Sequence, residues 1–273
     1  MVNGFAPKSL REALEIRQRE AVIPYGGGTD LMTAHHREGK YLFLHRVPEL
    51  TAITRDETYL RLGACCTFSQ VQAYPDTPAI LKEAISQIAA PAIRNLGTVG
   101  GNIGNGSAKA DSVLIFFVLD AKIRIMSSEG ERIIPIADIY KGRKKLDLAP
   151  DELIVEILLP RIRSKHYVYQ KVGARAALAI SRLSFAGLWS VEGGVVTACA
   201  TAFGAIEELV VRKPEIDALL IGVPITDLDA AAERYLTAYR EALNPIDGRT
   251  SAAYRKTVCM NLLEDFVERI RLT

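Results

Sequence analysis

The sequence predicts an α+β fold: an α/β region first, then a small antiparallel meander, then a helical tail. Short apolar strands alternate with amphipathic helices over residues 1–160. Three longer strand-like runs follow at residues 167–172, 179–188 and 195–203, the last two joined through Glu192-Gly193-Gly194 as in a hairpin. Two stripes of apolar side chains at helical spacing complete the chain. The first lies over residues 228–243, and the second, at steps of four residues, consists of Tyr254, Val258, Leu262, Phe266 and Ile270.

Composition excludes several classes of protein. The chain has 273 residues, of which 49% are hydrophobic, so it can bury a large core and is not intrinsically disordered. Its 34 basic and 32 acidic residues give a net charge of +2. Because so small a charge does not attract a polyphosphate backbone strongly, nucleic-acid binding is not expected as the main function. The longest apolar run, residues 113–119, is far shorter than the ~20 residues that span a bilayer. We therefore expect a cytoplasmic protein with no membrane span.

The cysteines and histidines predict no metal site. Cys65 and Cys66 are adjacent while Cys199 and Cys259 are far away, so no pair has the short spacing typical of a zinc or iron–sulfur site. Residues 35 and 36 are both histidine, but on a helix neighbouring side chains point about 100° apart and do not easily share a metal. Unclustered thiols fit a reducing compartment.

The N-terminal elements follow from local signals. Ser9 and Glu12 form a capping-box pattern at the start of a helix that runs to Arg19. A strand over residues 21–25 leads into a glycine turn and a helix start at residues 31–36, and a second strand follows at 41–45. This order predicts a βαβ unit with a parallel strand pair.

The middle of the chain is predicted in the same way. We expect a strand at residues 59–62, a helix at 78–90, a hairpin of strands at 121–126 and 131–136, and a strand at 153–159. Residues 98–110 hold four glycines and two asparagines, which suits neither helix nor strand but does suit a backbone that turns tightly around a ligand. Residues 113–119 are ambiguous by periodicity.

Two glycine-rich loops, at residues 26–29 and 98–106, are hard to explain as core packing. Glycine lets backbone N–H groups approach a phosphate with no Cβ in the way. Two such loops fit a pyrophosphate held from both sides, and plain tight turns remain the alternative for either loop alone. A Rossmann fingerprint starting at Gly26 fails because Leu31 stands at the last glycine position, and no P-loop pattern occurs.

The residues of these loops resemble a known family. Pro24-Tyr25-Gly26-Gly27-Gly28-Thr29-Asp30-Leu31 and Thr98-Val99-Gly100-Gly101-Asn102-Ile103-Gly104-Asn105-Gly106-Ser107, followed by Asp111, look like the two flavin-binding signatures of the FAD-carrying medium subunit of molybdenum hydroxylases. That family includes xanthine dehydrogenase, aldehyde oxidase and carbon monoxide dehydrogenase. Further matches before the second loop, in the first strand of the meander and at the start of the last helix extend the resemblance over essentially the whole chain.

The resemblance implies two domains. Residues 1–162 correspond to an FAD-binding domain of the p-cresol methylhydroxylase type, with α/β lobes at about 1–50 and 51–162. Residues 163–273 correspond to the C-terminal domain of carbon monoxide dehydrogenase flavoproteins, with a three-stranded antiparallel sheet and a helical bundle. It also implies that residues 113–119 form a helix, although their β-branched and aromatic side chains favour a strand.

The resemblance also assigns residues to FAD, and it implies no catalytic acid, base or metal ligand in this chain. Asp111 matches a position whose carboxylate contacts FAD, Ile154 one that meets the flavin by its backbone, and Lys171 one near the pyrimidine edge of the flavin. The two loops are expected around the diphosphate. The complete set of expected cofactor-binding residues is Pro24, Tyr25, Gly26, Gly27, Gly28, Thr29, Asp30, Leu31, Thr98, Val99, Gly100, Gly101, Asn102, Asp111, Ile154 and Lys171.

The function implied is electron transfer within a molybdenum hydroxylase similar to xanthine dehydrogenase. Electrons are expected to come from [2Fe–2S] clusters on a small subunit, fed by a molybdopterin-binding large subunit, and to leave FAD for NAD+ or another acceptor. Leu178 and Ala179 stand where the animal xanthine dehydrogenases have acidic residues near the flavin, so the acceptor stays open. Two alternatives also remain: a self-sufficient FAD-dependent oxidoreductase of the same fold, and a non-catalytic flavin-binding interaction protein.

Overall fold

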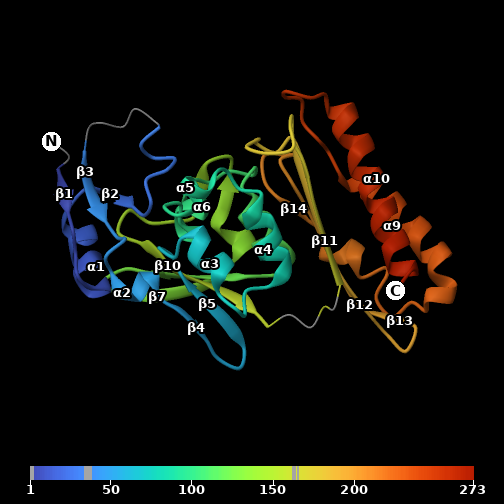
Figure 1. Cartoon of the computed structure of the whole chain (residues 1–273), viewed down its shortest axis with the longest axis horizontal. Helices are drawn as coiled ribbons and strands as arrows, with labels where there is room; N and C mark the ends of the chain where they lie inside the picture. Colours follow the sequence, from blue (N-terminus) through green and yellow to red (C-terminus); the bar gives the residue numbers. More distant parts are fainter. Residues whose placement is uncertain (1–2, 34–38, 162–163, 165) are drawn as a thin grey trace. The chain divides into compact units, whose positions relative to one another are not determined.

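The computed structural model describes residues 3–33, 39–161, 164 and 166–273, which form two compact units (Figure 1). The first unit comprises Met1–Ser107 and Asp120–Arg161, and the second comprises Ala108–Leu119 and Ile162–Thr273. The helix at residues 111–118 thus belongs to the second unit although the chain on both sides of it belongs to the first. The expected domain boundary at residues 162 and 163, and the histidine pair at 35 and 36, lie outside the described residues.

The first unit begins with a small parallel sheet of strand order β1-β3-β2, formed by Gly4–Phe5, Lys40–Phe43 and Val22–Tyr25. The expected parallel pair is therefore confirmed. Helices α1 (Leu10–Arg19) and α2 (Pro48–Thr51) supply side chains to its core, which includes Leu14, Leu42 and Leu50. The Ser9 hydroxyl caps α1 as expected, but the Glu12 carboxylate accepts from the Lys8 N–H, so the capping box is only half formed.

The helix expected to start after the first glycine loop is not seen in its described part. Residues 30–33 form turns, in which the Met32 N–H donates a hydrogen bond to the Gly28 carbonyl at 2.9 Å. The rest of the expected helix lies outside the described residues. The crossover between β2 and β3 is thus entered through turns.

A five-stranded antiparallel sheet of order β4-β5-β10-β6-β7 forms the rest of the first unit. Its strands are Ile53–Arg55, Tyr59–Gly63, Leu153–Pro160, Lys122–Met126 and Glu131–Pro135, which confirms the expected hairpin and the expected strand ending at Pro160. Between β5 and β6 lie four short helices: α3 (Phe68–Ala73), α4 (Ala79–Ser86), α5 (Pro91–Arg94) and α6 (Val99–Gly104). After β7 come a 3-10 turn (Ile136–Ile139), β8 (Tyr140–Gly142) and β9 (Lys145–Leu146).

Helix α6 corrects the expectation for residues 98–110, whose glycines favour neither helix nor strand. The Thr98 side chain caps this helix by accepting from the Gly101 N–H. Gly100 packs against Ala64 so closely that a Cβ would lie 2.6 Å from the Ala64 carbonyl oxygen. The cap and the tight contact outweigh the low helix propensity of glycine, about 1 kcal/mol per residue.

The second unit is a sheet of order β11-β12-β13-β14 with helices on both faces. The three expected strands are present as His166–Val172, Leu183–Glu192 and Val195–Gly204, and the two-residue strand β14 (Val211–Arg212) makes the sheet four-stranded rather than three-stranded. Eight consecutive residues of β12 are buried. A strand that is buried on both faces needs cover on both faces. Helix α7 (Asp111–Val118), itself buried in every residue, covers one face and confirms the helix implied at 113–119.

Helices α9 (Leu228–Ala242) and α10 (Ala252–Arg271) cover the other face of this sheet (Figure 1). The stripe expected on α9 is confirmed, but the one expected on α10 is wrong in detail. Tyr254 is exposed, and the buried face follows Cys259, Leu263, Phe266 and Ile270. Steps of four residues advance by more than one helical turn, so a strict period of four drifts around the helix.

A buried polar cluster joins the sheet to these helices. The Asp217 carboxylate, at the end of α8 (Pro214–Asp217), accepts from the N–H and hydroxyl of Thr201, from the Tyr239 hydroxyl and from Arg212. Burial raises the pKa of Asp217 while Arg212 lowers it. A short 3-10 turn, Ile225–Asp227, precedes α9. Within the described residues, no helix is both long and apolar enough to cross a membrane.

Candidate functional site

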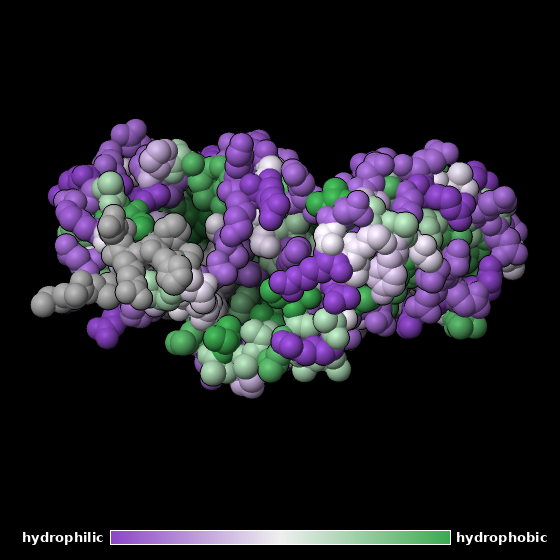
Figure 2. All heavy atoms as spheres, turned by 90° about the horizontal axis from the view of Figure 1, so that it is seen from above, coloured by the Kyte–Doolittle hydropathy of each residue, from purple (hydrophilic) through white to green (hydrophobic). Residues whose placement is uncertain are grey.

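A cavity of about 500 Å³ opens in the first unit, where both glycine-rich segments line it. Figure 2 shows a hollow with a hydrophobic floor and a largely hydrophilic rim, and further hydrophobic residues lie at the surface elsewhere on the same face. A third segment, residues 146–154 between β9 and the start of β10, also lines the cavity, and we call it the wall segment. Of the expected cofactor residues, those that line the cavity are Pro24, Gly26, Gly27, Gly28, Thr29, Asp30, Leu31, Thr98, Gly100, Gly101, Asn102 and Ile154.

The first glycine loop, residues 26–31, is pressed against the segment that precedes α6. A Cβ on Gly27 would lie 1.6 Å from the Leu96 carbonyl oxygen, so this position requires glycine. Gly28 has φ +69°, and a Cβ there would meet the Tyr25 hydroxyl at 2.2 Å. Tyr25 itself does not line the cavity. Its ring packs against Tyr41 and Phe43, so it supports the loop from beneath.

The backbone donors of this loop are the main chemical feature of the cavity. None of the N–H groups of residues 26–31 donates to an acceptor among the described residues. Consecutive backbone N–H groups of this kind form an anion-binding concavity. The loop therefore fits a diphosphate, as expected from its glycines.

The second glycine-rich segment has a different arrangement. The N–H groups of Val99 and Gly100 donate to the carbonyls of Cys66 and Ala64 at 3.0 and 2.8 Å, and that of Gly101 donates to the Thr98 hydroxyl at 3.1 Å. These donors are engaged within the protein, and Val99 faces away from the cavity. Among the described residues, the consecutive donors without an acceptor thus lie in the first loop. The second segment supports this loop: Thr98 Oγ1 lies 2.6 Å from the position of a Cβ on Gly26.

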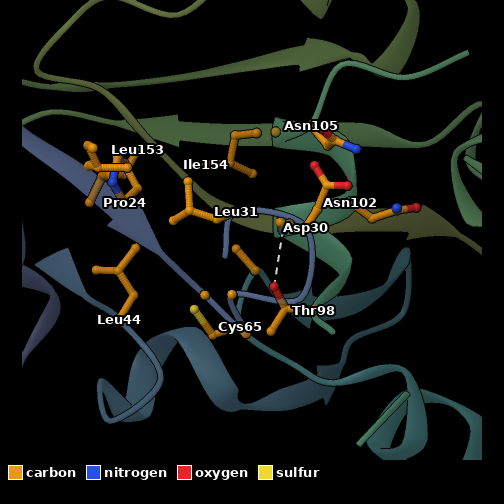
Figure 3. A pocket seen from close by; sticks show the side chains of 18 of the residues that line it. Pro24, Asp30, Leu31, Leu44, Cys65, Thr98, Asn102, Asn105, Leu153 and Ile154 are labelled. Atoms are coloured by element: carbon orange, nitrogen blue, oxygen red, sulfur yellow. Dashed lines mark hydrogen bonds between the residues drawn. The ribbon is translucent and has the colours of Figure 1, made fainter. Parts of the chain in front are cut away.

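The cavity has a polar and an apolar end (Figure 3). Asp30, Asn102 and Asn105 lie toward one end, whereas Pro24, Leu44 and Leu153 lie toward the other. An aromatic group suits the apolar end, and a chain of hydroxyls suits the amide and carboxylate groups. The residues present therefore fit the parts of FAD: an aromatic ring system, a diphosphate and a polyol.

Asp111 and Lys171 lie in the second unit and are joined to each other. The Lys171 ammonium donates to one carboxylate oxygen of Asp111 at 2.8 Å, and the Ser181 hydroxyl donates to the other at 2.6 Å. Both charged side chains are 8% exposed. The sequence predicts a separate contact with the cofactor for each of the two residues. In the structure they form one buried ion pair, and Ser181 is hydrogen-bonded to it through Asp111.

Several cavity residues carry no recognisable signal in the sequence. Arg17 lines the cavity from α1, where burial lowers its guanidinium pKa, and Cys65 lies at the cavity as a free thiol whose pKa burial raises to about 12. Glu152 comes from the wall segment. In the described part of the chain, no three His, Cys, Asp or Glu residues are grouped so as to hold a metal ion.

Comparison with known proteins gives two family matches. Residues 1–162 match the FAD binding domain in molybdopterin dehydrogenase, and residues 168–270 match the CO dehydrogenase flavoprotein C-terminal domain. The putative xanthine dehydrogenase FAD-binding subunit XdhB of Escherichia coli (strain K12) is 30% identical over 257 residues, which cover 89% of this chain and 85% of the relative. The nicotinate dehydrogenase FAD-subunit of Eubacterium barkeri is 29% identical, covering 81% of this chain and 80% of the relative.

Solved structures give the same picture. The crystal structure of a Cu,Mo-CO dehydrogenase in its cyanide-inactivated form contains a chain that matches with a TM-score of 0.89 and 25% identity. The match covers 99% of this chain and 98% of that chain. These findings confirm the fold and the family expected from the two glycine-rich segments.

Proposed function

This chain belongs to the FAD-binding subunits of the molybdenum hydroxylases, and from this premise we propose that it holds FAD in the cavity of its first unit for electron transfer. When bound, FAD supplies the redox chemistry, taking electrons from iron–sulfur clusters on a partner subunit and passing them to NAD+ or another acceptor. We further propose that the partners are a molybdopterin-binding large subunit and a [2Fe–2S] small subunit.

The single observation that carries the proposal is the run of backbone N–H groups at residues 26–31 that have no acceptor among the described residues. A diphosphate brings two negative charges and several acceptor oxygens, and hydrogen bonds to charged acceptors contribute about 1.5–3 kcal/mol each. Backbone donors bind such an anion with no need for a basic surface, which agrees with the small net charge of +2.

The expected roles of Asp111, Ile154 and Lys171 stay part of this proposal. Ile154, the second residue of β10, lines the cavity, where its backbone can meet the cofactor. A lone cation near the flavin N1 and C2 carbonyl favours the reduced ring. Because Asp111 neutralises Lys171, we propose that the two act on the cofactor as a dipole, held in place by Ser181.

Titration of the purified chain with FAD tests the binding step. We expect tight binding of FAD, visible flavin absorption bands after reconstitution, and weaker binding of FMN, which lacks the diphosphate. Absence of flavin bands after reconstitution would remove the central claim.

Stopped-flow reduction tests the electron route. In the assembled complex, flavin reduction on addition of a substrate of the large subunit supports electron transfer between subunits. Rapid flavin reduction by a substrate of the isolated chain would favour a self-sufficient oxidoreductase, and a flavin that never changes redox state would favour a structural role.

A further inference from the structure

The wall segment, residues 146–154, has little regular structure of its own, yet it forms one side of the cavity. Leu146, Leu148, Ala149, Pro150 and Glu152 all line the cavity, and none of them belongs to the five-stranded sheet. Its backbone makes few hydrogen bonds, among them the Asp147 N–H to the Ile139 carbonyl and the Glu152 N–H to the Ala149 carbonyl. Its two ends are paired in strands, at Leu146 and at Leu153, and between them its position depends largely on side chains.

Arg132, on β7, forms side-chain hydrogen bonds that hold the wall segment. Its guanidinium donates to both oxygens of the Glu152 carboxylate at 2.8 Å each, which is the bidentate geometry. It also donates to the Asp147 carboxylate at 3.1 Å and to the Asp147 carbonyl at 2.5 Å. The Glu152 carboxylate in turn accepts from the Ala149 N–H at 2.8 Å. Arg132 thus fixes the wall segment directly at positions 147 and 152, and through Glu152 at position 149.

The positive charge of Arg132 also neutralises the Glu152 carboxylate. The Glu152 side chain is only 16% exposed, and its hydrogen bond from Arg132 lowers its pKa, so the carboxylate is ionised at neutral pH. An unneutralised carboxylate in the wall of a cavity repels a bound diphosphate, most strongly where water is excluded. Arg132 cancels this charge.

We propose that Arg132 is a positioning residue for the cofactor: it holds the wall segment against the cavity and neutralises the Glu152 carboxylate in the cavity wall. This inference rests on the proposed function, because it concerns the same cavity and takes FAD as its ligand. Arg132 itself does not line the cavity and acts through Glu152 and Asp147.

The test compares FAD dissociation constants of Arg132→Gln, Arg132→Lys and a control. The control is Arg124→Gln, since Arg124 lies on the neighbouring strand β6, pairs with Glu131 and is 32% exposed against 34% for Arg132, but does not touch the wall segment. We expect roughly ten- to hundred-fold weaker FAD binding in Arg132→Gln, from the loss of charged hydrogen bonds. Arg132→Lys should fall in between, because lysine keeps the charge and loses the bidentate geometry. Arg124→Gln should bind as the wild type does.

Salt dependence separates positioning from general loss of structure. In Arg132→Gln, raising the salt concentration should restore part of the affinity by screening Glu152, and the double variant Arg132→Gln with Glu152→Gln should lose this salt effect. Equal affinity of Arg132→Gln and Arg124→Gln overturns the inference, and a double variant with the same salt effect overturns its electrostatic part. Failure of the wild-type chain to bind FAD overturns instead the proposed function.

Discussion

Replacing Gly27 by alanine tests the first glycine loop, because the position leaves no room for even one methyl group. The added Cβ would lie 1.6 Å from the Leu96 carbonyl oxygen, whereas ordinary contact begins at 3.4 Å. The loop and the Leu96 segment must therefore separate by about 1.8 Å. Such a movement shifts the N–H groups of residues 26–31, on which the diphosphate would depend.

The size of the effect follows from the hydrogen bonds at risk. A bond lengthened from ~2.9 Å by more than 1 Å is lost. If two bonds to the diphosphate are lost, at about 1.5–3 kcal/mol each, the FAD dissociation constant rises by roughly 10²–10⁴-fold. The apo chain should also lose about 1–3 kcal/mol of stability through overpacking.

Flavin fluorescence titration measures the dissociation constant, and urea unfolding of the FAD-free chain measures stability. Gly130→Ala is the matched control, since a Cβ there has nothing within 4 Å, and both quantities should stay at wild-type values. Gly27→Ala with wild-type FAD affinity would refute the role given to this loop. Lost stability with unchanged affinity would show that the loop packs against Leu96 but does not hold the diphosphate.

Three further changes have defined outcomes. Asp111→Asn should raise the midpoint potential of the bound flavin, measured by dye equilibration, because it removes the counter-charge of the buried Lys171. An unchanged potential would show that this ion pair does not act on the flavin. Tyr239→Phe should cost about 1–3 kcal/mol in urea unfolding, because it removes a hydroxyl donor from the buried Asp217, whereas exposed Tyr254→Phe should change stability by less than about 0.5 kcal/mol. The Tyr59 N–H and other donors lower the pKa of Asp56 to about 2, below the ~3.9 of the unfolded chain. The contribution of Asp56 to folding stability is therefore present above about pH 4 and lost as the pH falls to about 2. Asp56→Asn should flatten the pH dependence of the urea midpoint in this range, and an unchanged slope would contradict the assignment.

The first glycine loop could be predicted because its signals are local. A short apolar strand runs directly into three glycines, and the structure has β2 ending at Tyr25 and Gly28 at positive φ. The second segment could not be predicted in the same way. Its glycines argue against a helix, and α6 forms because Ala64 and Cys66, distant in sequence, accept its first N–H groups.

The wall segment shows a different limit of the sequence. Arg132 and Glu152 are separated by 20 residues, and the bond between them depends on how β7 and the start of β10 are placed in one sheet. Neither residue stands in a pattern that marks it. A side chain that acts on the cavity through a second residue becomes visible only when the register of the sheet is known.

The ion pair between Asp111 and Lys171 changes how the two residues are expected to act on the charge of the flavin. Taken separately from the sequence, they are an acceptor for a cofactor hydroxyl and a cation that favours the reduced flavin. In the structure, both oxygens of Asp111 are engaged, by Lys171 and by Ser181, 60 and 70 residues away in sequence. Because the field of a dipole falls faster with distance than that of a single charge, Asp111→Asn should shift the flavin potential more than Ser181→Ala, which leaves the charges in place. Equal shifts in the two variants would show that the position of the Asp111 carboxylate, rather than its charge, matters to the cofactor.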